Sequence, residues 1–431
     1  MVEKRSPISV SEAVRKVMGL LEPGDVERVP LEEAYGRFLA EDLIADHDVP
    51  AFDRSPYDGF AIRAEDTIAA SAENPAVFEV TGEIGAGSLY TKAAEKGHAV
   101  RIMTGAALPA GFNAVVMLEL VKEKSVQGRK LIEISRTYKK GDNISFKGED
   151  TLEGSVLSER GTIINPGISA LLATFGYESV PVAKQPVVGV LATGSELLEP
   201  GEPIKPGKIR NSNAYMVLSQ IKRAGADPLY LGKLPDDLDQ CFTTVRSALE
   251  KVDFLITTGG VSVGDYDYIP AVYEKLNASV LFNKVAMRPG SVTSAAELNG
   301  KLLFGLSGNP SACYVGFELF VRPVIRVSQG SAYPHLKKVK AVLGADFKKP
   351  NPFMRFVRAR MEFSEGGKVS VTSSGFDKSS AVSSLADADA FIVLPGGTRG
   401  YEKGMSVDAL LLSGGLGSEW PWENIVPSYR S

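Results

Sequence analysis

The sequence contains few of the residues that form disulfides or ligate transition metals. It has two cysteines, Cys241 and Cys313, and three histidines, His47, His98 and His335, among 431 residues. Both cysteines fall within apolar helical patterns, and the histidines show neither metal-ligand spacing nor a nucleophile partner. These absences argue against a disulfide framework, a cysteine metal site and histidine catalysis, and they fit a reducing cytoplasm.

Long apolar runs and an excess of positive charge are also missing. No segment approaches the roughly 20 apolar residues that cross a bilayer, and Met1–Ile8 lacks the apolar core of a signal peptide. The formal net charge is -4, which argues against a general nucleic-acid binder and requires any basic site to be local. We therefore predict a cytoplasmic protein that binds neither membranes nor nucleic acid.

Two common nucleotide-binding motifs are absent. A P-loop requires Gly-x-x-x-x-Gly-Lys-Ser/Thr, which the chain does not contain, and no Gly-x-Gly-x-x-Gly follows the first strand predicted in the α/β region. Any phosphate site must therefore use a different glycine-rich loop.

The sequence does contain enough material for several soluble domains. Hydrophobic residues make up 44% and charged residues 23% of the chain, and its length suggests roughly two to four domains of about 100 to 200 residues each. We predict a discontinuous N-terminal helical and β domain (1–45 and 141–185), a β-rich insertion (46–140), a parallel α/β sheet domain (186–330), a C-terminal β domain (331–412) and a tail (413–431).

Periodicity defines the expected elements. In the N-terminal half we predict helices over 10–21 and 161–174, a helical tendency over 31–38, and strands over 76–80, 99–103, 114–118 and 131–135. In the α/β region we predict strands over 187–191, 228–232, 252–256 and 302–306, with helices over 214–224, 238–249 and 311–321. The C-terminal domain is expected to contain strands over 339–343, 356–363, 369–372 and 391–394 in a half-exposed antiparallel sheet.

The third strand of the α/β region ends in the glycine-rich loop Thr257–Asp267. Its three glycines let the backbone approach a ligand and turn N–H groups toward it, while threonine and serine hydroxyls and two aspartates follow in the same loop. Backbone donors, hydroxyls and carboxylates together suit a phosphate and a divalent cation.

The other three strands also end in polar or glycine-bearing motifs, namely Thr193–Leu197, Pro235–Asp237 and Leu306–Pro310. Because ligands of open parallel sheets bind at the carboxyl ends of the strands, these motifs are expected to converge. Acids among them would suit Mg²⁺, which takes oxygen ligands. The alternative for Glu196, Asp236 or Asp267 taken singly is an acid near a helix start that only stabilises the helix dipole.

Basic residues and turns elsewhere in the chain can also be interpreted as purely structural features. Lys284 and Arg288 are either surface charges or ligands of an oxyanion, and the arginines of the strand over 356–363 with Arg355 form either a basic edge or a solvated face. Ser55–Ala61 contains an Asp-Gly turn signal, and the loops at Thr104 and Asp150 carry no specific signal of their own.

The motifs Ser55–Ala61, Thr193–Leu197, Thr258–Asp267 and Gly308–Pro310 together resemble the molybdopterin molybdenumtransferases of the MoeA type, also found as the E domain of gephyrin. The resemblance spans about Ser9 to Leu412, and Gly-Gly-Val-Ser-Val-Gly is its most specific motif. It implies an elongated homodimer with a β-rich insertion, an α/β domain and a β-barrel-like C-terminal domain. It also implies divalent-cation-dependent hydrolysis of adenylylated molybdopterin and insertion of molybdate or tungstate at the dithiolene.

The resemblance also implies the site residues. The catalytic positions are Asp58, Thr104, Asp150, Glu196, Asp236, Asp267, Lys284 and Arg288. The ligand-binding positions are Thr193, Gly194, Ser195, Thr258, Gly259, Gly260, Val261, Ser262, Gly264, Ser307, Gly308, Asn309 and Pro310. Glu196, Asp236 and Asp267 would place Mg²⁺ and the phosphate, Lys284 and Arg288 would hold oxyanions, and the Asp58 group would face this site across the dimer.

The sequence departs from many relatives at three positions. Arg288 stands where lysine is common, Ser291 where a second lysine is common, and Ser307 where proline is common. Because arginine offers a planar fork, the oxyanion geometry and the choice between molybdenum and tungsten stay open. Two alternative functions are the related adenylyltransferase, which shares the α/β domain but lacks both β-rich regions and is also a possible partner, and a gephyrin-like scaffold.

Overall fold

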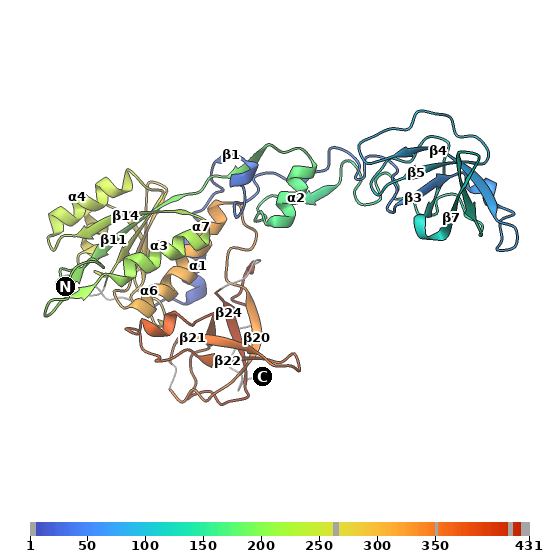
Figure 1. The fold of residues 1–431 in the computed structure, drawn as a ribbon. Coiled ribbons are helices and arrows are strands. Elements are labelled where there is room, and N and C mark those ends of the chain that lie inside the picture. The colour runs from blue at the N-terminus through green and yellow to red at the C-terminus, as the bar shows by residue number, and fades with distance from the viewer. Residues whose placement is uncertain (1–5, 262–266, 350–351, 413–416, 424–431) are drawn as a thin grey trace. The chain divides into compact units, whose positions relative to one another are not determined.

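A computed structural model describes residues 6–261, 267–349, 352–412 and 417–423 (Figure 1). Contacts divide the chain into two units. Unit 1 comprises 1–41, 160–169 and 178–431, and unit 2 comprises 42–159 and 170–177. Most of unit 2 is therefore inserted into the sequence of unit 1. The finer division into domains stays a prediction.

The centre of unit 1 is a six-stranded sheet with the strand order β14, β11, β15, β19, β18, β16. In that order the strands are Asp227–Leu234, Val187–Thr193, Phe254–Thr258, Lys301–Leu306, Ser294–Leu298 and Ser279–Phe282. The first four are parallel, as predicted, and β16 runs in the same direction, but β18 is antiparallel to both of its neighbours, β19 and β16, so the sheet is mixed rather than wholly parallel. The sequence reading missed β18 because its Ser-Ala-Ala start lacks the β-branched residues typical of strands.

Helices cover both faces of this sheet, since alternate residues of a buried strand point to opposite sides. Phe254 and Ile256 of β15 lie in one core cluster with α1, α3 and the helices after β19, whereas Leu255 lies in a second cluster with α4 and α5. The four named helices are α1 Val10–Met18, α3 Ser212–Ala224, α4 Leu238–Leu249 and α5 Ile269–Lys275. The result is a three-layer α/β/α domain (Figure 1).

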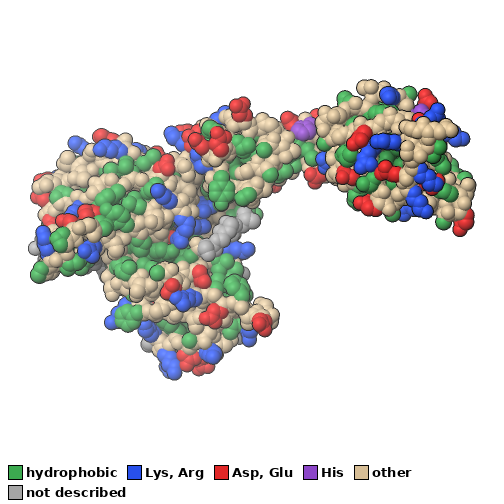
Figure 2. All heavy atoms as spheres, in the orientation of Figure 1, with side chains coloured by type: hydrophobic (Ala, Val, Ile, Leu, Met, Phe, Trp, Pro, Cys, Tyr) green, Lys and Arg blue, Asp and Glu red, His purple; other side chains and the backbone are tan. Residues whose placement is uncertain are grey.

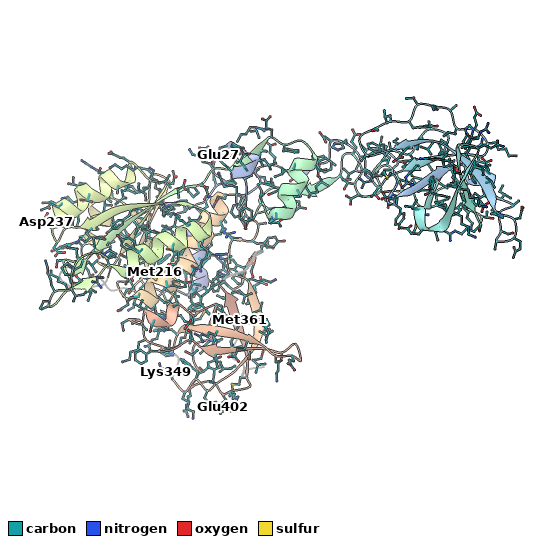
Figure 3. The ribbon with its side chains drawn as sticks, viewed as in Figure 1. Glu27, Met216, Asp237, Lys349, Met361 and Glu402 are labelled. Carbon is teal, nitrogen blue, oxygen red and sulfur yellow. The ribbon has the colours of Figure 1, made fainter. Side chains whose placement is uncertain are left out.

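Polar residues just before three of these helices determine where they start. Ser9 caps α1, Asn211 caps α3 and Asp237 caps α4, each accepting a hydrogen bond from a backbone N–H of the first turn at 3.2, 3.2 and 2.9 Å. Figure 3 shows Asp237 at the start of α4.

Two helical predictions need adjustment. The tendency over 31–38 yields only the 3-10 helix η1, Leu31–Glu33, because Gly36 adopts a left-handed backbone with φ 78° that ends the turn. The apolar helix over 311–321 is present and extends further, as α6 Pro310–Gly316, a π-helical segment η4 Phe317–Val321 and α7 Arg322–Ser328.

The C-terminal strands close into a small barrel. Its strands are β20 Lys338–Leu343, β21 Met354–Phe363, β22 Val369–Ser373, β23 Ala390–Leu394 and β24 Ser406–Leu411. They pair in the order β21, β22, β20, β24, β23, and β23 pairs again with β21. This closure confirms the predicted barrel-like domain.

The arginines of β21 do not form a simple solvated face, so that interpretation is wrong. Arg358 is only 1% exposed, and its Nε donates to the Ser384 hydroxyl at 3.0 Å. Asp377 lies 3.6 Å from Arg358 and 3.3 Å from Arg355. Only Arg360 is exposed. A charge cluster is therefore buried on the face of β21 opposite the barrel-core residues Val357 and Ala359, and alternation alone did not reveal it.

Unit 2 contains a second six-stranded sheet with the order β6, β3, β5, β4, β8, β7. In that order the strands are Ala114–Met117, Gly59–Ile62, His98–Ile102, Ala76–Ile84, Arg129–Ile134 and Val121–Val126. The Asp-Gly pair read as a turn instead leads into β3. A Cβ on Gly59 would lie 2.0 Å from the Val116 carbonyl oxygen, so only glycine permits this close strand pairing.

Short elements complete both units. The minor strand pairs are β1 Val26–Pro30 with β10 Ser179–Ala183, β2 Leu43–Ile44 with β9 Val156–Ser158, β12 Leu197–Leu198 with β13 Ile209–Arg210, and β17 Met287–Arg288 with β21. The remaining helices are α2 Pro166–Thr174, η2 Ala64–Thr67, η3 Leu118–Leu120 and η5 Ser383–Leu385. Figure 2 shows acidic and basic side chains mixed over the visible face of each unit. Within the described ranges, no helix has both the length and the apolar character that a bilayer crossing requires.

The described end of the tail packs on its own chain. The guanidinium of Arg15 in α1 lies 5.3 Å from the Trp420 ring centroid, and the Trp422 ring meets Phe356 of β21 edge-on at 6.4 Å. Both indoles also lie edge-on to His335, at 5.8 and 6.1 Å. The tail thereby ties the barrel to α1 and encloses a histidine.

Enclosure of His335 makes folding stability sensitive to pH. The residue is 2% exposed, and burial, followed by the charge of Arg322, lowers the pKa of His335 from 6.5 to about 4. Between pH 6.5 and about 4, His335 is therefore protonated in the unfolded chain but neutral in the folded protein. The free energy of unfolding consequently decreases as the pH falls through this range. We expect this histidine to account for a loss of about 2–3 kcal/mol between pH 7 and pH 4.5.

Urea unfolding at both pH values measures this effect. In His335→Gln the loss between pH 7 and pH 4.5 should shrink by about 2 kcal/mol, whereas His98→Gln, a change on unit 2 outside this aromatic enclosure, should behave like the unaltered protein. An equal loss in all three proteins would contradict the assignment.

Candidate active site

The register of the parallel strands brings their carboxyl ends to one edge of the sheet. Thr193 of β11 lies opposite Leu234 of β14, and Thr258 of β15 lies opposite Leu306 of β19. The segments that follow these strands therefore leave the sheet side by side. They surround a cavity of about 900 Å³, a size suited to a small-molecule ligand.

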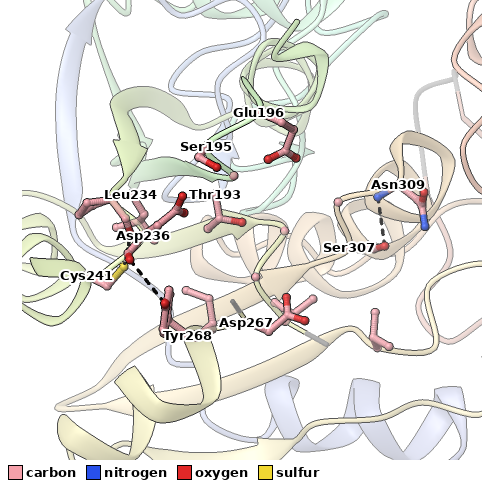
Figure 4. Close-up of a pocket in the computed structure, with 18 of the residues that line it drawn as sticks. Thr193, Ser195, Glu196, Leu234, Asp236, Cys241, Asp267, Tyr268, Ser307 and Asn309 are labelled. Atoms are coloured by element: carbon pink, nitrogen blue, oxygen red, sulfur yellow. Dashed lines mark hydrogen bonds between the residues drawn. The ribbon is translucent and has the colours of Figure 1, made fainter. Parts of the chain in front are cut away.

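Most of the predicted residues of the α/β domain line this cavity (Figure 4). They are Thr193, Gly194, Ser195, Glu196, Asp236, Gly259, Gly260, Val261, Asp267, Ser307, Gly308 and Asn309. Thr258 and Pro310 adjoin the lining residues in the chain without lining the cavity themselves. Ser262, Gly264 and Asp265 lie outside the described residues.

Glycine allows three strand ends to meet at this cavity. Gly259 has φ 93°, and a Cβ there would lie 2.4 Å from the Thr193 hydroxyl oxygen. That hydroxyl donates to the Thr258 carbonyl at 3.1 Å, and the Gly259 N–H donates to the Leu306 carbonyl at 2.8 Å. The backbone of β15 therefore turns within contact of both neighbouring strands.

A second glycine accommodates the Glu196 carboxylate. Gly194 has φ 126°, and a Cβ there would lie 2.4 Å from Glu196 Oε2. The carboxylate thus folds back over the backbone of its own loop. Since the element after Glu196 is the strand β12 rather than a helix, the helix-dipole alternative does not apply to this acid.

The two acids that follow β14, Asp236 and Asp237, have different roles. Asp237 caps α4, whereas Asp236 lines the cavity. The turn is held by the Cys241 thiol, which donates to the Pro235 carbonyl at 2.8 Å, and by the Tyr268 hydroxyl, which donates to the Asp236 carbonyl at 3.4 Å (Figure 4). Sequence reasoning missed both lining residues, although Tyr268 directly follows the glycine-rich loop.

Glu196, Asp236 and Asp267 approach the cavity from three strand ends. Nevertheless, the described part of the chain contains no group of three His, Cys, Asp or Glu side chains close enough together to ligate one metal ion. Mg²⁺ in proteins usually takes one or two carboxylates and completes its shell with substrate phosphate and water. This donor set fits a cation shared with a phosphate better than a closed cage.

The segment after β19 is held from two sides. The Asn309 N–H donates to the Ser307 hydroxyl at 3.2 Å, and the Asn213 amide of α3 donates to the Gly308 carbonyl at 2.8 Å. Ser307 thus forms a local hydrogen bond that a proline at this position could not form.

Lys284 and Arg288 do not line the cavity, although Val292, four residues beyond Arg288, does. Arg288 is exposed in β17, beside strand β21 of the barrel, and Lys284 is half-buried. Within the described ranges neither cation forms an ion pair with an acid. Both charges are therefore available to an anionic ligand.

In unit 2 the structure brings two of the three predicted residues together. Asp58 Oδ1 accepts hydrogen bonds from the Thr104 backbone N–H at 2.7 Å and the Thr104 hydroxyl at 2.8 Å. The backbone donor first, and the hydroxyl second, lower the pKa of Asp58. Asp150 is exposed in a different loop, where its N–H donates to the Val49 carbonyl at 3.0 Å.

Comparisons with known proteins cover nearly the whole chain. Residues 8–176 match the MoeA N-terminal region (domain I and II), residues 189–327 match the probable molybdopterin binding domain, and residues 340–412 match the MoeA C-terminal region (domain IV).

Full-length relatives agree with these matches. The chain is 60% identical over 430 residues to a molybdopterin molybdenumtransferase of Bacillus subtilis (strain 168), covering 100% of both chains. It is 48% identical over 410 residues to one of Staphylococcus epidermidis, covering 95% of this chain and 97% of that relative. A crystal structure of the molybdopterin biosynthesis MoeA protein from Pyrococcus horikoshii OT3 is similar with a TM-score of 0.80 at 32% identity, covering 94% of this chain and 100% of that one.

Proposed function

The chain belongs to the molybdopterin molybdenumtransferase family, whose role is in molybdenum cofactor biosynthesis, and we propose that it hydrolyses adenylylated molybdopterin and inserts molybdate or tungstate into the dithiolene. The observation that carries the proposal is the cavity at which hydroxyls, glycine backbone and three acids converge from four strand ends. The matched N- and C-terminal regions separate the chain from the adenylyltransferase alternative, which would have the α/β domain without them.

The hydroxyls and glycines of the cavity supply donors for the substrate phosphate. Ser195 and Ser307 present hydroxyls at the wall, and Gly260 leaves its backbone open to a ligand because it carries no Cβ. The Thr258 hydroxyl lies behind this wall; it is buried and has no hydrogen-bond partner among the described residues, so it has capacity left for an ordered water.

We propose Mg²⁺ as the divalent cation, held by carboxylates drawn from Glu196, Asp236 and Asp267. When bound, the cation would neutralise charge on the phosphate oxygens as the adenylate is released. The carboxylates themselves position the phosphate-bearing end of the substrate. The acid and hydroxyl donors are all oxygen atoms, which is the ligand type that this cation requires.

The incoming metal oxyanion is a substrate, for which we propose Lys284 and Arg288 as the binding cations. Their freedom from ion pairs within the described ranges supports this role. The Arg288 fork can donate two parallel hydrogen bonds to an oxyanion, unlike a lysine at the same position.

We further propose a cytoplasmic homodimer in which Asp58, Thr104 and Asp150 of one copy complete the site of the other. The adenylyltransferase that makes the substrate is the expected partner. Support for the compartment comes from Cys241 and Cys313, both of which are buried free thiols.

Incubation with adenylylated molybdopterin, Mg²⁺ and either molybdate or tungstate tests the function. AMP release and the amount of cofactor formed are measured by chromatography, with chelator-treated protein as the control. We expect both products only when the cation is present. No AMP release with either oxyanion would overturn the proposal.

The backbone at Gly194 offers a focused test of the Glu196 assignment. In Gly194→Ala the new Cβ would occupy the place of the Glu196 carboxylate, and the left-handed backbone would cost about 1–2 kcal/mol for alanine. We expect AMP release to fall by about tenfold or more.

Gly201→Ala is the matched control, because a Cβ there meets open space in the same loop and the residue has no left-handed backbone. It should retain the AMP release of the unaltered protein. Equal activities of the two variants would argue against a role for the Glu196 carboxylate at its observed place.

A further inference from the structure

A polar network outside the cavity holds the loop that carries Glu196. The Glu199 carboxylate accepts hydrogen bonds from the Tyr230 hydroxyl at 2.8 Å and from the Tyr215 hydroxyl at 2.9 Å. The side-chain amide of Asn211 donates to the Tyr230 hydroxyl at 3.0 Å. One carboxylate therefore collects donors from two tyrosines, and one of these is oriented by an asparagine.

The partners of Glu199 stand on the rigid part of the domain. Tyr230 belongs to strand β14, and Tyr215 belongs to helix α3, whose cap is Asn211. The two tyrosine rings also contact each other, with centroids 5.8 Å apart. The network thus fastens the loop to the sheet and to a helix at the same point.

Backbone pairing transmits this attachment to Glu196. The Ile209 N–H donates to the Glu196 carbonyl at 3.0 Å, and the Asn211 N–H donates to the Leu198 carbonyl at 2.8 Å. These bonds belong to the two-stranded pair of β12 and β13. Strand β12 lies between Glu196 and Glu199 in the chain, and β13 directly precedes Asn211 and α3. Release of Glu199 would free one end of this short pair.

The charge of Glu199 strengthens the attachment. Burial opposes its ionisation, but the Tyr230 and Tyr215 hydroxyls and the charge of Lys233 together lower the pKa of Glu199. An ionised carboxylate accepts from both phenols at once, and hydrogen bonds to a charged acceptor are stronger than neutral ones. The Lys233 ammonium also donates to the Leu197 carbonyl at 3.0 Å.

We propose that Glu199, Tyr215 and Tyr230 are positioning residues that keep the Glu196 carboxylate at the cavity wall and thereby set the concentration of divalent cation that the reaction needs. None of the three lines the cavity, so each acts through the loop rather than on the substrate. The inference rests on the proposed function, because it assigns Glu196 to the cation.

Three variants of the full-length protein test the network: Tyr230→Phe, Tyr215→Phe and Glu199→Gln. The phenylalanine changes remove a single hydroxyl each, so the fold should persist, and Tyr35→Phe at an exposed tyrosine is the matched control. Amide hydrogen exchange of residues 197–211 reports the loop without any substrate. The Mg²⁺ concentration for half-maximal AMP release reports the site, with Glu196→Ala as the reference.

We expect Tyr230→Phe and Glu199→Gln to raise both the exchange rate of the loop amides and the required Mg²⁺ concentration by about tenfold. At saturating Mg²⁺ their kcat should return to within about twofold of the unaltered value, since the cation then holds the loop in place. Tyr215→Phe should show a smaller change in the same direction, and Tyr35→Phe none.

If Tyr230→Phe changes neither the exchange rate of the loop amides nor the Mg²⁺ requirement, the positioning role is wrong. AMP release by the unaltered protein would in that case still support the proposed function. A lower kcat at every Mg²⁺ concentration would also overturn it, because that result indicates a structural role alone. Absence of AMP release from the unaltered protein would overturn the proposed function, and the cation role of the network with it.

Discussion

Asp267→Ala should abolish cofactor formation, with AMP release lowered by about a hundred- to a thousandfold, while the protein stays folded. Asp267 is half-buried at the cavity wall, two residues before α5, where we propose that its carboxylate faces the cation and the phosphate. A preorganised charge at a site of developing charge contributes far more to the rate than to folding. The measurements are AMP release in saturating substrate and the midpoint of thermal unfolding.

Asp239→Ala is the control for this experiment. Asp239 is an exposed acid of α4 that pairs with Lys275 and does not line the cavity. Its loss should leave AMP release unchanged. Comparable AMP release by Asp267→Ala and Asp239→Ala would remove Asp267 from the active site.

Asp58→Ala should have a similarly large effect from the other unit. We expect cofactor formation to fall by about a hundredfold or more, because the variant lacks the carboxylate that two Thr104 donors hold in its ionised form. Asp58→Asn separates charge from geometry, since its amide oxygen can still accept from Thr104. An inactive but folded Asp58→Asn would show that the charge is what matters.

Asp142→Ala is the matched control in unit 2. Asp142 also accepts a hydrogen bond from a backbone N–H, that of Lys139 at 2.8 Å, and has no assigned role in the site. It should therefore form cofactor normally. Normal conversion by Asp58→Ala as well would refute the assignment of this carboxylate.

The two aspartate variants together test the shared site. Each inactive chain keeps the group that the other lacks, so a mixed dimer would contain one intact site if Asp58 and Asp267 come from different copies. Random pairing of equal amounts would then restore about a quarter of the activity. No restoration in co-expressed mixtures would place both residues of a site on one copy.

Local chemistry near the strand ends was readable from the sequence. The motifs at Thr193–Leu197 and Leu306–Pro310 follow short apolar runs, and such runs predict parallel strands whose ends meet. These runs predicted four of the six central strands. The C-terminal barrel, by contrast, was expected from the family resemblance. The helix over 311–321 was also predicted, because its apolar residues continue over several turns.

Other features could not be read because they depend on residues far apart in the chain. The antiparallel strand β18 has small residues and is defined by its pairing with β19. The burial of Arg358 could not be predicted from its strand, because it depends on contacts with Ser384 and Asp377, which lie later in the chain. In the pair Asp236 and Asp237, spacing alone does not say which acid caps the helix and which faces the cavity.

The sequence by itself determined the chemical inventory of the site, because glycines, hydroxyls and acids after short apolar runs are local properties of the chain. The tertiary structure decided which members of that inventory meet. Strand register placed Thr193 opposite Leu234 and Thr258 opposite Leu306, and the fold of the loop brought Glu199 to Tyr230, 31 residues away. Such contacts are non-local, so no pattern within a strand or helix encodes them.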